Sequence, residues 1–222
     1  MNQAGETYYL ATPASFNPAN LPADLSTATA SSTTECFVTG TRIATPAGEA
    51  RVEDLKTGDE ILTAASDTIA VKWIGVQRVF TAFRPPERLR PVRVSAGALG
   101  GGLPKRDLRL TADHGLVVDS LLINAGALVN GSTIDWASTE EMGEFYTVYH
   151  IETEAHDVIL AEGTPAETYI DYIGRSHFHN YGEYLELYGE ERTIAEMDLP
   201  RISAPRLVPA SIRARLAAAQ AA

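Results

Sequence analysis

The chain has 222 residues, of which 45% are hydrophobic, so it can bury a sizeable core and is not disordered as a whole. Its 18 basic and 29 acidic residues give a net charge of −11, which argues against a protein that binds the phosphate backbone of nucleic acids. No stretch approaches the roughly 18 consecutive apolar residues of a membrane-spanning helix. The N-terminus lacks the basic and apolar regions of a cleavable signal peptide, and the cellular compartment stays open.

Residues 1–35 differ in composition from the rest of the chain. They contain no Lys or Arg and end in a run of small polar residues from Ser26 to Glu35. Such residues bury too little apolar surface to offset the entropy that is lost on ordering. We therefore predict a flexible N-terminal segment and linker over residues 1–35.

Residues 36–168 have the pattern of a β-domain. Strands are expected at residues 42–44, 50–52, 60–63, 70–79, 91–94, 108–110, 115–118, 121–123, 145–151 and 158–160. Short strands separated by Gly, Pro and Asp at this spacing are typical of an all-β domain. Gly75 is expected to bend the longest of these strands.

A weak internal echo links two segments of this domain. Residues 55–61 resemble residues 123–129, because apolar, glycine and apolar positions follow in the same order. Two such short patterns can match by chance, or they can mark a duplicated β-unit.

Residues 169–222 form a C-terminal extension of different character. It begins with many aromatic residues, which we expect to pack on the β-domain rather than to form a binding cage. Its last segment predicts a short terminal helix, capped by Ser211.

The chain has one cysteine, Cys36, placed where the polar linker meets the first strand. A single cysteine cannot form an internal disulfide, so it is either a buried small hydrophobe or a reactive thiol. His150 lies in the predicted strand 145–151, and His114 and His156 lie between predicted strands. A thiol beside imidazoles suits nucleophilic acyl chemistry, because one imidazole can take the thiol proton and another can protonate a leaving nitrogen. These residue types alone leave the substrate open.

Several blocks together resemble the Hint (Hedgehog/intein) domain family, and in particular its bacterial variants. The resemblance lies in residues 36–43, in residues 52–62, in the T-x-x-H block of Thr111 and His114, and in residues 156–163. It implies the Hint fold, a compact curved β-module of duplicated units related by a pseudo-two-fold axis. It covers residues 36–168 and implies neither a cofactor nor a metal.

The resemblance also implies self-processing. Cys36 would attack the carbonyl of Glu35 in an N-to-S acyl shift, and water or an external nucleophile would resolve the resulting thioester. The N-terminal segment would be the substrate in cis, in a single turnover. Whether the Glu35 carboxylate repels the thiolate or promotes hydrolysis is open.

The family's motifs also suggest roles for the polar residues. Thr111 and His114 would contact the scissile amide, and His114 would protonate its nitrogen. His150 stands where inteins commonly carry an aspartate, and His156 would support the C-terminal side of the site. Two aspartates, Asp113 and Asp157, would either orient a histidine by hydrogen bonding or lie in exposed turns.

The chain departs from splicing inteins at its C-terminal junction. Glu167 and Thr168 occupy the positions of the His-Asn pair, and a threonine has no amide nitrogen to cyclise. A His179-Asn180 pair does occur downstream, but Tyr181 follows it and cannot accept an acyl group. We therefore expect N-terminal autocleavage without protein splicing.

Four alternatives remain at this stage. The domain could be a catalytically silent structural or interaction module, or a cysteine hydrolase that acts on an external substrate. A sterol could serve as the acyl acceptor. Finally, His177, His179 and Glu183 could contribute to a metal site, although surface histidines explain this pattern better.

Overall fold

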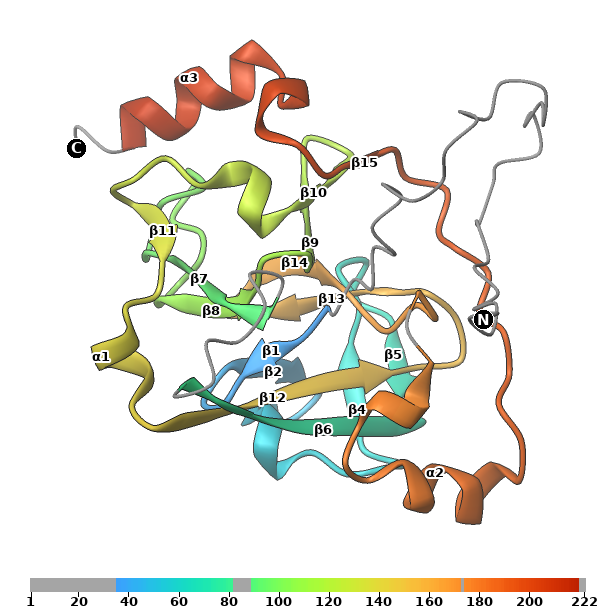
Figure 1. Cartoon of the computed structure of the whole chain (residues 1–222). Coiled ribbons are helices and arrows are strands. Elements are labelled where there is room, and N and C mark those ends of the chain that lie inside the picture. Colours follow the sequence, from blue (N-terminus) through green and yellow to red (C-terminus); the bar gives the residue numbers. More distant parts are fainter. Residues whose placement is uncertain (1–34, 82–88, 173, 220–222) are drawn as a thin grey trace, which may run out of the picture. The chain divides into compact units, whose positions relative to one another are not determined.

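The computed structural model describes residues 35–81, 89–172 and 174–219, all within one compact unit of the chain (Figure 1). The flexible segment predicted over residues 1–35 lies outside these residues, apart from Glu35, which is buried. None of the described helices is long and apolar enough to cross a membrane.

Two large β-sheets dominate the fold. The first has the strand order β11-β7-β8-β1-β12-β6. Its strands are β1 (Phe37–Val38), β6 (Trp73–Phe80), β7 (Pro91–Val94), β8 (Leu108–Thr111), β11 (Ile134–Trp136) and β12 (Phe145–Glu152). The second has the order β15-β10-β9-β14-β13-β2-β3. Its strands are β2 (Arg42–Thr45), β3 (Gly48–Arg51), β9 (Gly115–Val118), β10 (Leu121–Asn124), β13 (Val158–Ala161), β14 (Thr164–Glu167) and β15 (Arg201–Ile202).

Smaller elements complete the fold. The strands β4 (Glu60–Leu62) and β5 (Thr68–Ala70) form a separate hairpin, and the α-helices are α1 (Thr139–Met142), α2 (Tyr181–Tyr188) and α3 (Ala210–Ala219). Only short helices occur among the described residues, so the all-β prediction for the central domain is confirmed.

The domain contains an internal duplication. A hairpin, a 3₁₀ helix and a further strand follow one another in β2-β3-β4 and again in β9-β10-β11. The second hairpin and its 3₁₀ helix each begin 73 residues after their counterparts, at Gly115, Leu121 and Ala125 against Arg42, Gly48 and Val52. The eight-residue strands β6 and β12 are likewise equivalent, and they pair with each other along their whole length. This arrangement agrees with the predicted duplicated β-units.

The register expected for this duplication was wrong by five residues. Gly126 lies inside the second 3₁₀ helix (Ala125–Leu128), whereas Gly58 follows the first (Val52–Asp54), so these two glycines are not equivalent. The counterpart of Gly58 is Gly131, and both have positive φ angles, of 92° and 76°. Glycine adopts such angles without strain. The feature that the two repeats share is therefore this glycine turn, and not the apolar pattern of residues 55–61 and 123–129.

Three further expectations for secondary structure need correction. The run of residues 70–79 is divided between β5 and β6, and Gly75 lies inside β6 without ending it. The strand series does not close at residue 160, because β14 and β15 follow. Ser211 does not cap the last helix, which already begins at Ala210, directly after Pro209. The Pro209 carbonyl accepts the Arg213 N–H at 3.1 Å, so the helix begins two residues earlier than a Ser211 cap implies.

The extension packs on the β-domain through aromatic residues, as predicted. Tyr169, Phe178 and Tyr184 are buried in one cluster with Trp73 of β6. The ring of Phe178 covers Gly75, where a Cβ atom would lie 2.8 Å from the ring. The glycine therefore serves close packing rather than a bend.

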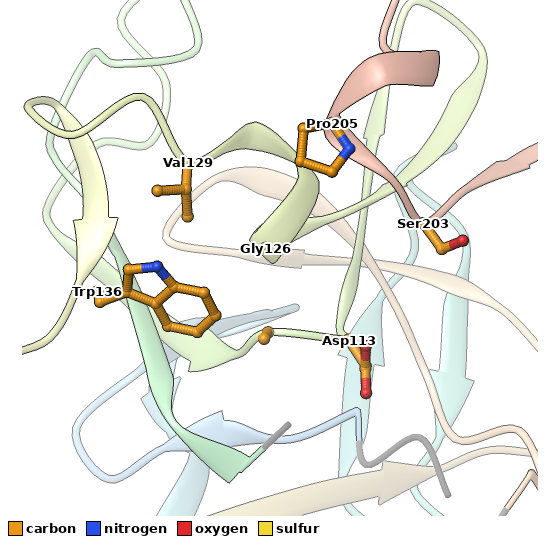
Figure 2. A pocket seen from close by; sticks show the side chains of 7 residues that line it. Asp113, Gly126, Val129, Trp136, Ser203 and Pro205 are labelled. Atoms are coloured by element: carbon orange, nitrogen blue, oxygen red, sulfur yellow. The ribbon is translucent and has the colours of Figure 1, made fainter. Parts of the chain in front are cut away.

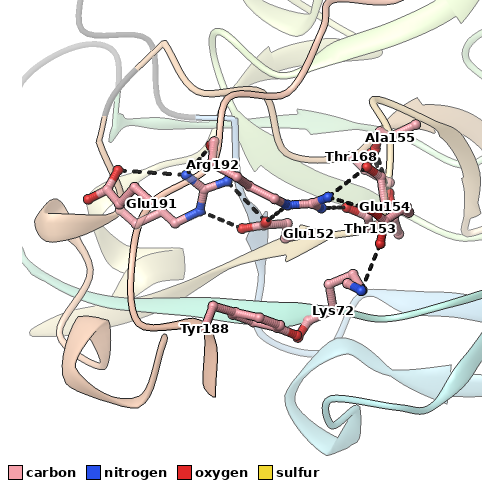
Figure 3. Close-up of polar contacts among 10 residues, drawn as sticks. Lys72, Glu152, Thr153, Glu154, Ala155, Thr168, Tyr188, Glu191 and Arg192 are labelled. Atoms are coloured by element: carbon pink, nitrogen blue, oxygen red, sulfur yellow. Dashed lines mark hydrogen bonds and ion pairs between the residues drawn. The ribbon is translucent and has the colours of Figure 1, made fainter. Parts of the chain in front are cut away.

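A buried ion pair strengthens this contact (Figure 3). Arg175 of the extension donates to both carboxylate oxygens of Glu152, at 2.7 and 3.0 Å, and neither side chain is more than 1% exposed. Arg192 donates to the same carboxylate at 3.1 Å. The guanidinium of Arg175 also lies over the rings of Tyr169 and Tyr184, 4.7 Å from each centroid. Charge and aromatic surface together hold the extension against β12.

Candidate processing site

Cys36 lies immediately before β1 and is completely buried. Its backbone is held by Thr111 at the end of β8, the neighbouring strand. The N–H of Cys36 donates to the Thr111 hydroxyl at 2.9 Å, and the Thr111 N–H donates to the Cys36 carbonyl at 2.9 Å. The nitrogen of the peptide bond between Glu35 and Cys36 is therefore fixed by a hydroxyl group.

His150 approaches the Cys36 thiol from the opposite neighbour of β1. Strands β1 and β12 pair with Phe37 opposite Tyr149, which places Cys36 level with His150. Along β12 the buried residues alternate, so His150 points inward on the same face as Tyr146 and Val148. Its Nδ1 atom lies 3.5 Å from the Cys36 sulfur.

Burial makes both members of this pair neutral. It raises the pKa of the Cys36 thiol well above its usual value, and the negative charge of Glu35 raises it further. Burial also lowers the pKa of His150 well below its usual value, and the nearby imidazole of His114 lowers it further. His150 is packed between the rings of Tyr169 and Phe178, which keep water away. At neutral pH the site therefore holds the Cys36 thiol in its protonated form and the His150 imidazole in its neutral form.

His114 follows β8 and lies against the ring of Phe37, at 4.2 Å between centroids. Its Nε2 atom is 3.1 Å from the backbone carbonyl oxygen of Glu167. A carbonyl only accepts, so Nε2 carries the hydrogen and Nδ1 has the lone pair. That buried Nδ1 makes no hydrogen bond of ordinary geometry among the described residues, although the Cys36 backbone lies close enough to the ring to raise the pKa of His114. Burial lowers the pKa of His114 to about 4, although the Glu167 carboxylate opposes the shift.

The Glu167 side chain forms the centre of a buried polar cluster. One carboxylate oxygen accepts from His156 Nε2 at 2.9 Å and from Arg201 Nη2 at 2.5 Å. The other accepts from the Gly115 N–H at 2.5 Å and from Arg201 Nη1 at 3.1 Å. Burial opposes ionisation of Glu167, but the hydrogen bonds from His156 and Arg201 outweigh it and lower its pKa to about 2. Glu167 is thus a fixed negative charge.

The structure brings four of the predicted site residues into one contact chain around the Glu35–Cys36 bond, namely Cys36, Thr111, His114 and His150. His156 is linked to them through Glu167, and its Nδ1 accepts the Met197 N–H at 3.1 Å. From the sequence alone, Glu167 is only the residue that stands in place of an intein histidine.

The two aspartates are placed differently from Glu167. The Asp113 carboxylate accepts from Asn124 at 3.5 Å, and the backbone of Asp157 bonds to Thr168. The carboxylate that orients His156 is that of Glu167, not of Asp157. Arg201, which fixes Glu167, was missed altogether. It is separated from the recognisable motifs, and the surrounding sequence gives no signal for it.

A pocket of about 520 Å³ is lined in part by Asp113 (Figure 2). Trp136, Val129 and Pro205 supply apolar walls, whereas Asp113 and Ser203 supply polar atoms. Pro205 and Ser203 come from the extension, so the pocket is lined by residues from both parts of the chain. It adjoins the segment that carries His114.

Within the described parts of the chain, no group of three His, Cys, Asp or Glu side chains could hold a metal ion. The two histidines considered for a metal contact backbone instead. His177 Nδ1 lies 3.1 Å from the Gly174 carbonyl, and His179 Nδ1 accepts the Arg78 N–H at 3.4 Å.

The sequence matches the family model for the Hint domain over residues 35–172, more than half of the chain. Among solved structures, the chain is similar to the MchDnaB-1 intein (16% identity, TM-score 0.44, covering 60% of this chain and 99% of that one). It is also similar to the bacterial intein-like domain from Clostridium thermocellum (17%, 0.43, 62% and 100%). A third similar structure is the DnaB intein from Synechocystis sp. PCC 6803 (11%, 0.44, 62% and 100%). No curated protein matches the sequence. The family-model match and the duplicated β-architecture agree, and the chain belongs to the Hint domain family.

Proposed function

We propose that this Hint domain cleaves the peptide bond between Glu35 and Cys36 in its own chain. The Cys36 sulfur attacks the Glu35 carbonyl carbon, the C–N bond breaks, and the Cys36 nitrogen leaves as a free amine. Residues 1–35 are then attached to the sulfur as a thioester. Water or an external nucleophile attacks this thioester, releases residues 1–35 and restores the Cys36 thiol. The reaction is a single turnover in cis.

The contact between Cys36 and His150 carries this proposal. With Nδ1 3.5 Å from the sulfur, a neutral His150 can accept the thiol proton as the sulfur attacks. Burial keeps the thiol pKa high, so little thiolate exists beforehand. The base must therefore act in the attacking step itself.

The leaving nitrogen needs a proton, and we assign its delivery to His114. The lone pair on its Nδ1 must first take a proton, because Nε2–H is engaged with the Glu167 carbonyl. The proton that leaves the sulfur stays on His150, and the nitrogen takes its proton from His114, which must be protonated from solvent beforehand. Proton exchange with solvent then returns His150 to its neutral form, so the overall count balances. Thr111 holds that nitrogen through its hydroxyl throughout. If the Cys36 nitrogen lost this position, the proton transfers at the sulfur and at the nitrogen would both be misaligned.

The proposed reaction stops at N-terminal cleavage. Thr168 stands where a splicing intein carries asparagine, and its hydroxyl accepts the Asp157 N–H at 2.8 Å and contacts the Thr153 hydroxyl at 3.1 Å. No side-chain amide is present there to cyclise. We therefore propose no release of a C-terminal segment and no ligation.

Intact mass spectrometry tests the proposal. Freshly purified protein is incubated with and without dithiothreitol, beside a Cys36→Ala chain. Thiol-accelerated appearance of the fragment 36–222 in the wild type, absent from Cys36→Ala, is the expected result. A wild-type chain that stays whole under both conditions would refute it.

A second candidate function is a catalytically silent structural or interaction module. The complete burial of Cys36 favours it, because burial and the neighbouring Glu35 charge both keep the thiol protonated. If this alternative holds, intact mass spectrometry gives the same masses over time for Cys36→Ala and for the wild type, with and without dithiothreitol.

A further inference from the structure

The C-terminal extension reaches into the site through Arg201. Strand β15 pairs parallel with β10, with Arg201 opposite Leu122, and this register brings the arginine to the end of β14. There its Nη1 and Nη2 atoms donate hydrogen bonds to the two carboxylate oxygens of Glu167, at 3.1 and 2.5 Å. Arg201 lies outside residues 35–172, which match the family model.

Glu167 in turn holds the segment that carries His114. Its backbone carbonyl accepts the Nε2–H of His114, and its carboxylate accepts the N–H of the next residue, Gly115. A Cβ atom at position 115 would lie 2.5 Å from the same carboxylate oxygen, so the close approach requires glycine. The side chain and the backbone of one residue therefore fix both the ring and the main chain at 114–115.

We propose that Arg201 is a positioning residue for His114 that acts through Glu167, and that the C-terminal extension is thereby part of the processing machinery. The inference rests on the proposed self-cleavage. Arg201 supplies two of the four hydrogen bonds to the buried Glu167 carboxylate. A buried carboxylate that loses such partners must move, admit water or take up a proton. Each of these changes would displace the carbonyl that sets the tautomer of His114.

Arg201 has further polar and aromatic neighbours besides Glu167. Nη1 also donates to Asn124 at 3.1 Å, Nε lies 3.6 Å from a Glu196 oxygen, and the guanidinium lies 5.3 Å from the Tyr172 ring centroid. The planar guanidinium of arginine has several N–H groups in fixed directions, so it can make all these contacts at once. The ammonium group of lysine cannot make the same pair of parallel hydrogen bonds to a carboxylate.

Arg201 also influences His114 electrostatically. Burial is the main cause of the low His114 pKa, the Glu167 charge raises it, and the positive charge of Arg201 lowers it. Removing that charge should therefore raise the His114 pKa.

The first test compares cleavage rates of Arg201→Gln and Arg215→Gln chains by intact mass spectrometry. Arg215 is a matched control, because it also joins the extension to the domain, through an exposed ion pair with Asp119 at 2.9 Å. We expect Arg201→Gln to slow cleavage about 10- to 100-fold, as misplacement by an ångström can do, and Arg215→Gln to leave it unchanged. An Arg201→Gln chain that is folded and cleaves at the wild-type rate overturns the inference.

If Arg201→Gln fails to fold, Arg201→Lys decides the question. It keeps the charge but loses the paired hydrogen bonds, so cleavage should still slow; a wild-type rate overturns the inference. An Arg201→Gln, Glu167→Gln double variant adds a further test. If Arg201 acts through Glu167, the double variant is no slower than the slower single variant. Fully multiplied effects would contradict that route.

The second test does not depend on cleavage. In a Cys36→Ala background, long-range ¹H–¹⁵N NMR reports the His114 tautomer and pKa. We expect the Nε2–H tautomer in the parent and, with Arg201→Gln added, a mixed tautomer and a higher pKa. Unchanged values would overturn the inference. Should the wild type fail to cleave, the proposed function falls, and this measurement still judges the positioning role.

Discussion

The Nε2 atom of His114 and the backbone carbonyl oxygen of Glu167 lie 3.1 Å apart, although the two residues are 53 positions apart in the sequence. This contact leaves the lone pair of Nδ1 as the only basic position on the ring. It therefore determines which atom of His114 can exchange a proton, and it makes β14 part of the proposed processing site.

Replacing His150 should abolish most of the proposed cleavage. His150→Gln keeps a polar group near the sulfur but removes the base, and general-base catalysis typically contributes 10²- to 10⁴-fold. We expect the rate constant for appearance of the fragment 36–222 to fall by about that factor. His177→Gln is the control, because His177 is exposed and contacts only the Gly174 carbonyl in the described structure. Equal rates for the two variants would exclude His150 as the base.

The Thr111 hydroxyl should contribute to both stability and cleavage. Thr111→Val has nearly the same shape but leaves the Cys36 N–H without its acceptor in a fully buried place. Such an unsatisfied donor costs about 1–3 kcal/mol of the free energy of unfolding. Urea denaturation measures this loss, and Thr111→Ser should recover most of it. A Val variant as stable as the wild type would show that the hydrogen bond contributes nothing.

The free energy of unfolding should fall between pH 6.5 and pH 4. The pKa of His114 is about 4 in the folded protein against 6.5 as its ordinary value, so the unfolded chain takes up the proton first. The contribution of His114 to the free energy of unfolding is therefore fully present above pH 6.5. It is lost as the pH falls from 6.5 toward 4, and the loss amounts to about 3 kcal/mol. His150 acts in the same direction, because its pKa is also lowered.

Urea denaturation at several pH values checks this dependence. His114→Gln should flatten the decline between pH 6.5 and pH 4, whereas His177→Gln should keep it. Glu167 adds a separate loss at lower pH, because its pKa of about 2 lies below the usual 4.5. Equal free energies of unfolding at pH 7 and pH 5 would contradict the low pKa values of both histidines.

Gly75→Ala should weaken the contact between the extension and β6. The new Cβ atom would lie 2.8 Å from the Phe178 ring, which has no free space to retreat into. Overpacking of this kind costs about 1–3 kcal/mol. Gly182→Ala is the matched control. It lies in α2 with nothing within 4 Å of its Cβ position, and alanine there should raise stability slightly. Thermal unfolding of both variants measures the difference, and equal melting temperatures would refute it.

Arg175→Met should be far more damaging than Arg215→Met. Arg175 forms a fully buried ion pair with Glu152, whereas the pair of Arg215 and Asp119 is exposed. Removing one partner of a buried pair costs about 3–5 kcal/mol, because the other charge stays buried, and an exposed pair contributes about 0–1 kcal/mol. The free energies of unfolding of the two variants should differ accordingly. A difference below 1 kcal/mol would show that Arg192, which also donates to this carboxylate, or water relieves the Glu152 charge.

The sequence predicted most of the strands and the family, because β-branched runs and turn glycines are local signals. The strand ends at residues 70–73 were missed, since an apolar run does not show where one strand stops and the next begins. Gly75 was misjudged because its need for a small side chain comes from Phe178, about a hundred residues away.

The candidate site was predictable only where it follows family motifs. Cys36, Thr111, His114 and His150 carry recognisable chemistry or motif spacing, and the structure brings them together. Glu167 and Arg201 could not be paired from the sequence, because their contact depends on the parallel register of β15 against β10. Long-range pairing of a two-residue strand leaves no periodic pattern to read.

The same parallel pairing has a consequence for the timing of synthesis. The ribosome makes Cys36, Thr111, His114 and His150 well before residue 201. Until Arg201 has left the exit tunnel, β15 cannot join β10 and the Glu167 carboxylate lacks its bidentate partner. In a nascent chain, the N-terminal segment is therefore joined to a site that still lacks the contact between Arg201 and Glu167. The rate of translation sets the earliest time at which this site can be complete.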